Sequence, residues 1–260
     1  AGEYWFSIGD EMLRRLDTVS AEYRARFVDN SVSLRMGVTP TLRSGLVSGA
    51  ARIASEEPGF VKFEMTYALT SAELVEQLNL HQLNCALVNG EAIADHRGSF
   101  ATAEVFADET ALLVPASVPI AEIERALHRT ETLAGPLASY VEVEAGTPLR
   151  NRTETWYRGH LPAARPAFAA MTYPAAVDLC AEGLATTHCP LSLVAGLPAD
   201  TQKRLHIFPL PGMSRQVVLA MPRHLMTLAP YARIFKRIEE FCRDAGKPDL
   251  PHVSALPIPA

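Results

Sequence analysis

The sequence lacks any long hydrophobic run, since apolar stretches such as Ala111–Pro115 are only the length of a strand. A membrane-spanning helix needs roughly 18 consecutive apolar residues, so we expect no membrane partner. The sequence also lacks an excess of positive charge, because 24 Lys and Arg stand against 29 Asp and Glu, a net charge of −5. Surfaces that bind nucleic acid are normally basic, so we do not expect these residues alone to form one.

Cysteines are few, and their spacing excludes several kinds of site. Cys85, Cys180, Cys189 and Cys242 form no C-x-x-C pair, which argues against a disulfide framework. The histidines show no metal-binding spacing, and the G-x-S-x-G, P-loop and G-x-G-x-x-G motifs do not occur. We therefore expect no metal, no cofactor and no enzymatic activity.

What is present is typical of a globular protein. The 260 residues correspond to between one and two domains of roughly 150 residues each. Hydrophobic residues make up 48% of the chain, enough for a sizeable core. Ala1–Asp10 lacks the basic start and apolar centre of a signal peptide, which predicts a cytoplasmic protein.

The chain begins with a predicted helix over residues 3–27. Apolar residues recur there at steps of three and four, with charged residues between them. An apolar stripe between charged residues is typical of a helix that packs against a partner helix. Residues 1–29 are therefore predicted to form a linker and dimerisation helix. An alternative is that the helix folds back on its own domain. The predicted dimer contacts are Leu13, Leu16, Val19 and Tyr23.

Two sets of alternating strands and helices follow, about 105 residues apart. The first has strands at 32–38, 60–67 and 84–90, with helices at 42–56 and 71–80. Thr70 and Glu73 have the T-x-x-E spacing of a capping box for the second of these helices. The second set has strands at 139–144, 166–171 and 185–189, with helices at 149–159 and 174–183. Such alternation predicts an α/β fold with parallel-type sheets in two Rossmann-like lobes.

The remaining segments set the predicted domain bounds. Strands at 110–115 and 216–221 are the expected crossings between lobes, and a helix at 228–242 closes the fold. Lobe I is predicted to comprise 32–107 and 226–245, and lobe II to comprise 108–225. The proline-rich tail, 246–260, is expected to be extended or disordered.

In four stretches the sequence resembles the LysR-type transcriptional regulators. Leu34–Leu42 is similar to the "LRIG-x-S-P-T-L" opening of that family's effector domain, and Thr70–Leu78 with Leu83–Val88 to its "S-x-E-L-x-x-x-L … D-L-A-L-V" stretch. Val143–Arg150 resembles the "G-S-P-L-R" loop, and Val177–Pro190 the "V-A-A-G-x-G-I-x-L-L-P" stretch. Asn84 stands where the family usually has Asp, and His188-Cys189 where it usually has two aliphatic residues.

The resemblance implies a two-lobed fold like the type 2 periplasmic binding proteins, with a small-molecule effector between the lobes. It also implies a homodimer or homotetramer that acts on DNA. Ala1–Glu3 resembles the point where the family's winged helix-turn-helix gives way to the linker helix. The DNA-binding domain is therefore expected to lie outside this sequence. The rival interpretations are a transporter's solute-binding protein and an enzyme on the same scaffold.

The loops after the predicted strands are the candidate effector site. Ligands of open parallel sheets bind beyond the carboxyl ends of the strands, and free N–H groups at helix starts favour anions. We therefore expect a small acidic effector; the alternative is that the threonines are plain helix N-caps. The predicted contacts are Thr39, Pro40, Thr41, Thr70, Ser71, Asn89, Thr147, Pro148, Thr172 and Tyr173.

Two further questions stay open at the level of sequence. Arg43, Arg150 or Arg152 could pair with a carboxylate of the effector, although arginines so placed are more often solvated. Cys180 and Cys189 could form a redox pair, but their places in an apolar helix and strand favour a structural role.

Overall fold

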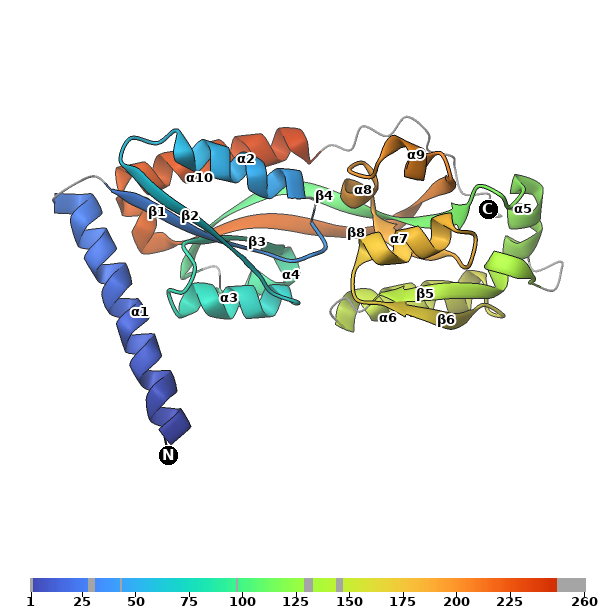
Figure 1. Ribbon diagram of the computed structural model, residues 1–260, viewed down its shortest axis with the longest axis horizontal. Helices are drawn as coiled ribbons and strands as arrows, with labels where there is room; N and C mark the ends of the chain where they lie inside the picture. The colour runs from blue at the N-terminus through green and yellow to red at the C-terminus, as the bar shows by residue number, and fades with distance from the viewer. Residues whose placement is uncertain are drawn as a thin grey trace. The chain divides into compact units, whose positions relative to one another are not determined.

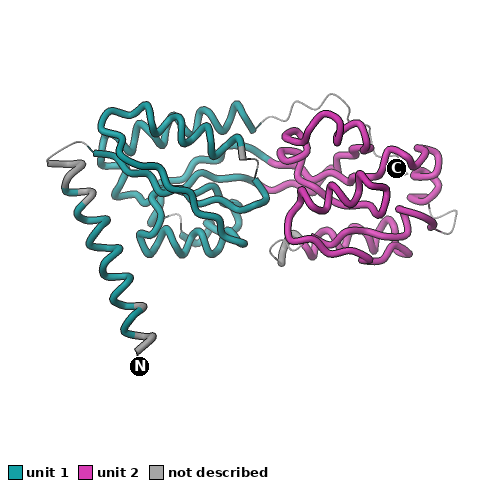
Figure 2. Tube along the Cα trace, viewed as in Figure 1, with its two compact units in different colours: residues 1–107, 216–247 teal, residues 108–215, 248–260 magenta. Residues whose placement is uncertain are grey.

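The computed structural model describes residues 2–27, 31–42, 44–96, 98–128, 133–143 and 147–246. They form two α/β units (Figure 2). Unit 1 holds the described residues up to Ala107 and from Gln216 onward, and unit 2 holds Asp108–Arg215. The expectation of two α/β lobes is confirmed. The predicted tail lies outside the described residues, apart from Gly246.

Unit 1 contains the first predicted set of strands and helices. Strand β1 (Val32–Val38) pairs in parallel with β2 (Phe60–Tyr67) on one side and with β3 (Cys85–Asn89) on the other. Helices α2 (Ser44–Ser55) and α3 (Ser71–Asn79) form the crossovers. The sequence predicted these five elements to within two residues at each end.

Strand β3 of unit 1 is buried on both faces, so its alternate residues enter different cores. Cys85 and Leu87 of β3 join the core beneath α2 and α10 (Ala229–Ala245), whereas Ala86 and Val88 join the core beneath α3. Figure 1 shows α2 and α10 on one side of the sheet and α3 on the other. Helices on both faces explain why β3 is almost continuously apolar.

Two long strands run through both units. β4 (Phe100–Pro115) and β8 (Leu205–Pro222) are neighbours in the sheet, and β8 pairs antiparallel with β3. The predicted strands 110–115 and 216–221 are only the later parts of β4 and β8, so the prediction was too short. Pro209, Pro211 and Gly212 within β8 are residues that usually interrupt a strand.

Unit 2 contains the second predicted set. β5 (Ser139–Val143) pairs in parallel with β6 (Arg165–Ala170), and β7 (Thr187–Pro190) pairs antiparallel with β4. The six-stranded sheet is therefore mixed rather than wholly parallel, because β8 runs antiparallel to β3 and β4 runs antiparallel to β7. Helices α6 (Thr147–His160) and α7 (Tyr173–Ala181) follow β5 and β6.

Several short elements were not predicted. They are too brief to show a hydrophobic period. They are the helices α4 (Gly90–Ile93), α5 (Ile120–Leu127), α8 (Leu191–Val194) and α9 (Ala199–Gln202), and the 3₁₀ turns Ala94–His96, Gly135–Ala138 and Arg223–Thr227.

Helix α1 (Gly2–Phe27) is continuous, as predicted. Thr18 joins it to the rest of unit 1. Its Oγ1 donates to the His81 carbonyl at 3.3 Å and accepts from Nη2 of Arg35 at 2.9 Å. The predicted dimer contacts are exposed, with 64% of Leu13 and 61% of Leu16 accessible.

Candidate functional site

The predicted site residues of unit 1 lie at one edge of its sheet, where the parallel strands β1, β2 and β3 end. The hydroxyl groups of Thr39 and Thr41 are 2.6 Å apart in the turn after β1. Ser71, at the start of α3, accepts a hydrogen bond of 3.0 Å from the backbone N–H of Asn89 at the end of β3. These contacts join adjacent loops and place several hydroxyl and amide groups along this edge.

Some of these polar groups also cap helices. Thr70 accepts from the N–H of Glu73 at 3.2 Å, and the Glu73 carboxylate accepts from the N–H of Thr70 at 3.4 Å, which confirms the predicted capping box. Asn89 likewise accepts from the N–H of Glu91 at 3.3 Å. Capping therefore accounts for Thr70 and Asn89 without a ligand.

The predicted residues of unit 2 fall at the starts of α6 and α7. Thr172 caps α7 by accepting from the N–H of Ala175 at 3.4 Å, and Tyr173 is buried at the first turn. Thr147 and Pro148 open α6, but their side chains lie outside the described part of the chain. Both loops follow parallel strands, as the sequence predicted.

The three candidate arginines have different surroundings. Arg43 lies outside the described residues. Arg152 donates to the Ser214 carbonyl at 3.3 Å. Arg150 contacts two carboxylates: its Nη2 lies 2.6 Å from Glu142 and its Nε 3.1 Å from Glu154. The hydrogen bond to Glu154, followed by the charge of Glu142, raises the pKa of Arg150.

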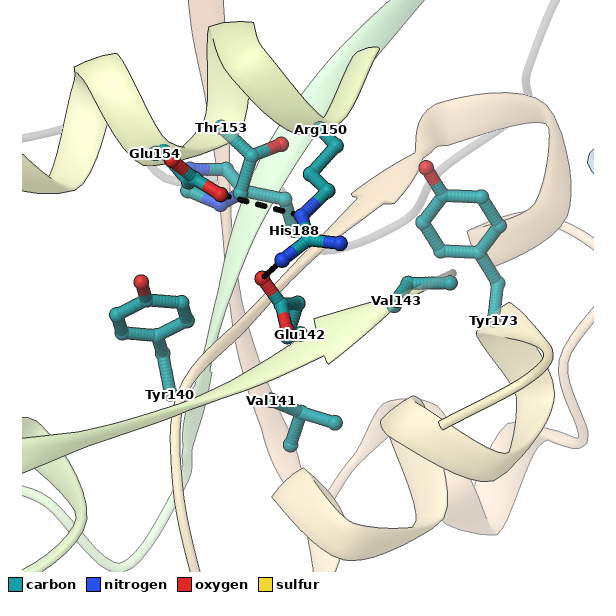
Figure 3. Close-up of a pocket in the computed structure, with 9 residues that line it drawn as sticks. All are labelled: Tyr140, Val141, Glu142, Val143, Arg150, Thr153, Glu154, Tyr173 and His188. Carbon is teal, nitrogen blue, oxygen red and sulfur yellow. Dashed lines mark hydrogen bonds and ion pairs between the residues drawn. The ribbon is translucent and has the colours of Figure 1, made fainter. Parts of the chain in front are cut away.

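A pocket in unit 2 surrounds this arginine (Figure 3). Side chains from β5, α6, α7 and β7 converge there, and Arg150 lies between the carboxylates of Glu142 and Glu154. The sequence did not predict this convergence, although Tyr173 and Arg150 had been singled out. The lining residues are Tyr140, Val141, Glu142, Val143, Arg150, Thr153, Glu154, Tyr173 and His188.

His188 is the most unusual residue of the pocket. It is 2% exposed, and its ring meets the edges of Trp156 and Tyr157 at centroid distances of 4.9 and 4.7 Å. Among the described residues neither ring nitrogen has a hydrogen-bond partner. Burial, with a smaller effect from His160, lowers the pKa of His188 to about 3. The imidazole is therefore neutral at physiological pH.

A second buried polar cluster lies where β4 and β8 reach unit 2. Asp108 accepts from Nη2 of Arg215 at 2.8 Å and from the hydroxyl and N–H of Ser192 at 2.8 and 3.1 Å. Each carboxylate oxygen is thus satisfied, which offsets the cost of burying the charge. A small pocket beside this cluster is lined by Thr110, Arg152, Pro190, Met213, Ser214 and Arg215.

The cysteines are free and buried, the surroundings in which a thiol acts as a small apolar side chain. Burial raises the pKa of Cys180 and of Cys189 well above the range of reactive thiols. Cys189 belongs to the core beneath α7, whereas its neighbour His188 packs on aromatic rings of α6. This opposite orientation is the one expected for adjacent strand residues.

Neither a metal site nor a membrane-spanning helix occurs in the described residues. No group of three or more His, Cys, Asp or Glu side chains there could hold a metal ion. No helix in the same part of the chain is long and apolar enough to span a membrane.

Comparison with known proteins identifies the chain's relatives. The family model described as the LysR substrate binding domain matches residues 29–243, which is most of the sequence. No curated protein sequence matches the chain.

Solved structures share the fold at low sequence identity. The reduced regulatory domain of OxyR2 from Vibrio vulnificus has a TM-score of 0.57 at 14% identity, covering 81% of this chain and 95% of that one. A mutant OxyR from Corynebacterium glutamicum bound to hydrogen peroxide has a TM-score of 0.60 at 13% identity, covering 95% and 74%. Full-length CbnR in complex with its target DNA has a TM-score of 0.61 at 14% identity, covering 94% and 82%. The fold is thus the expected two-lobed, periplasmic-binding-protein-like one.

Proposed function

Because the chain belongs to the LysR family of transcriptional regulators, we propose that it is the effector-sensing and oligomerisation region of such a regulator. The observation that carries this proposal is the family match over residues 29–243, on a chain that folds as two α/β units. DNA is bound through an N-terminal winged helix-turn-helix domain outside the present residues. The family consists of regulators, so it favours neither an enzyme nor a transporter's solute-binding protein.

The effector is a small acidic metabolite held by the loops that follow the parallel strands. Thr39, Thr41 and Ser71 supply hydroxyl groups at the strand ends of unit 1. The first turns of α3 and α7 add backbone N–H groups, which attract negative charge. The full set of proposed contacts is Thr39, Pro40, Thr41, Thr70, Ser71, Asn89, Thr147, Pro148, Thr172 and Tyr173.

Helix α1 carries the dimer contact. Leu13, Leu16, Val19 and Tyr23 form an exposed stripe, and the described part of unit 1 does not cover it. Exposed apolar surface of this extent is typical of a site of association with another protein. The assembly is a homodimer or homotetramer built on this helix.

A thermal-shift screen tests the acidic effector. Small mono- and dicarboxylates are compared with their amides and with amines of matched size. Ligand at 100 times its Kd stabilises the folded state by about 2.7 kcal/mol, a readily measured shift. We expect at least one carboxylate to stabilise the protein and its amide not to. Stabilisation by amides or amines alone would contradict the acidic effector.

A further inference from the structure

The pocket of unit 2 contains a buried polar group that the protein itself does not satisfy. His188 lines this pocket, and among the described residues neither of its ring nitrogens is hydrogen-bonded. The cavity volume at the centre of the pocket is about 10 Å³. This is enough for about one water molecule. A bound polar group at this point would supply the missing hydrogen bond.

Arg150 occupies a position between two carboxylates next to this space. Figure 3 shows its guanidinium reaching across the pocket toward Glu142 and Glu154. The Arg150 side chain is 46% exposed, and exposed ion pairs contribute only about 0–1 kcal/mol. Arg150 can therefore leave this position for solvent at little cost, leaving behind two converging negative charges.

A groove next to the pocket shares part of its lining. It has a cavity volume of about 180 Å³ and is lined by Glu142, Arg150, Ala169, Ala170 and Met171. Arg150 and Glu142 line both the groove and the inner pocket. Rotation of Arg150 would therefore join the groove to the space beside His188.

We propose that this pocket binds a small cationic ligand, an amine or a guanidine. Its charged group takes the place of the Arg150 guanidinium between Glu142 and Glu154 and donates a hydrogen bond to a ring nitrogen of His188. The body of the ligand lies in the groove over Ala169 and Ala170.

The charges and hydrogen-bonding groups favour a cation over an anion. Burial lowers the pKa of His188 to about 3, so its ring offers a lone pair and no positive charge. Glu142 and Glu154 would repel a carboxylate but accept charge-assisted hydrogen bonds from an ammonium or guanidinium group. Tyr140 in the pocket wall adds an aromatic ring, which also favours cations.

This inference does not rest on the proposed acidic effector. The two sites share Tyr173 alone, and every lining residue of the pocket lies within unit 2. Either site can fail without affecting the other.

Removal of the Arg150 side chain, whose guanidinium lies between Glu142 and Glu154, tests the proposal. In Arg150→Ala, methylguanidinium is expected to bind saturably in the millimolar range, as followed by calorimetry and by the NMR signals of the His188 ring. The wild-type protein should bind it about tenfold more weakly, because the tethered Arg150 competes at a high effective concentration. Acetate, as the anionic probe of matched size, should leave the His188 ring signals unchanged.

Three further variants locate the bound cation. In the Arg150→Ala background, Glu142→Gln and His188→Leu should each weaken methylguanidinium binding by about tenfold, the loss of one charge-assisted hydrogen bond. Arg158→Ala is the control, since Arg158 also pairs with Glu154, at 2.9 Å, but does not line the pocket. Circular dichroism verifies that each variant is folded. Absence of saturable binding by folded Arg150→Ala, a response of the His188 ring signals to acetate rather than to methylguanidinium, or binding unchanged by Glu142→Gln and His188→Leu would each overturn the proposal.

Discussion

At the scale of single residues, His188 determines how pH acts on this protein. Its pKa is lowered to about 3 in the folded state, whereas an unfolded chain has the ordinary value of 6.5. The unfolded state therefore binds more protons between these two values, and stability falls as the pH drops from 6.5 toward 3. Above pH 6.5 the residue is neutral in both states and adds no pH dependence.

His188→Leu should remove this dependence. Between pH 7.5 and pH 5 the wild-type protein is expected to lose about 2 kcal/mol of unfolding free energy through His188, and the leucine variant should not show this loss. Leucine also replaces a buried imidazole that has no hydrogen-bond partner among the described residues, so the variant should be more stable at both pH values. Urea unfolding at the two pH values measures the difference. His128→Gln, at an exposed histidine, is the control and should keep the wild-type slope.

The sequence was enough to single out two residues of the unit 2 pocket, but not to predict that they line the same pocket. It singled out His188 as a departure from the family pattern and Arg150 as a candidate contact. It did not predict the pocket, because this depends on how β5, α6, α7 and β7 pack together. The spacing of Arg150, Glu154 and Arg158 at four-residue steps was an available signal, since such residues lie on one face of a helix.

At the scale of elements, a residue at the start of a helix can cap the helix or contact the effector. Thr70 allows these two roles to be distinguished. Thr70 is the N-cap of α3 and also a proposed effector contact. Thr70→Ala should lower the unfolding free energy by about 1 kcal/mol, the usual value of a cap. Thr70→Asp should keep the cap, because Asp is an equally good N-cap residue.

The aspartate variant then tests ligand contact without loss of stability. Its added negative charge should weaken binding of the acidic effector by tenfold or more, a change of about 1.4 kcal/mol. The measurement is calorimetric titration with a carboxylate found in the thermal-shift screen. If affinity and stability both stay at their wild-type values, Thr70 is a helix cap alone.

Elements with a clear period were predicted well, and those without one were not. Phe60–Tyr67 was predicted with both ends correct. The first halves of β4 and β8 were missed although both are strands for their whole length. In β8 the prolines argued against a strand, and tertiary pairing overrode that local preference.

At the scale of the whole molecule, oligomerisation depends on α1 in our proposal. Leu13→Glu with Leu16→Glu should give a monomer or a poorly soluble protein, because charge then interrupts the exposed apolar stripe. Light scattering coupled to size exclusion measures the mass. Glu11→Lys is the control, since Glu11 is exposed and, at about 100° per residue, lies on the far side of the helix from Leu13 and Leu16. An unchanged oligomer mass for the leucine double variant would rule out this contact.

The Asp108–Arg215 ion pair has a consequence for how the protein is made. These residues begin and end the described part of unit 2, and their charged groups lie 2.8 Å apart. This part of unit 2 is therefore an uninterrupted insertion whose two ends meet. On the ribosome it emerges before α10 and before residues 216–222 of β8, which unit 1 needs to complete its sheet and its larger core. The described part of unit 2 is thus able to finish folding before unit 1, although unit 1 begins earlier in the chain.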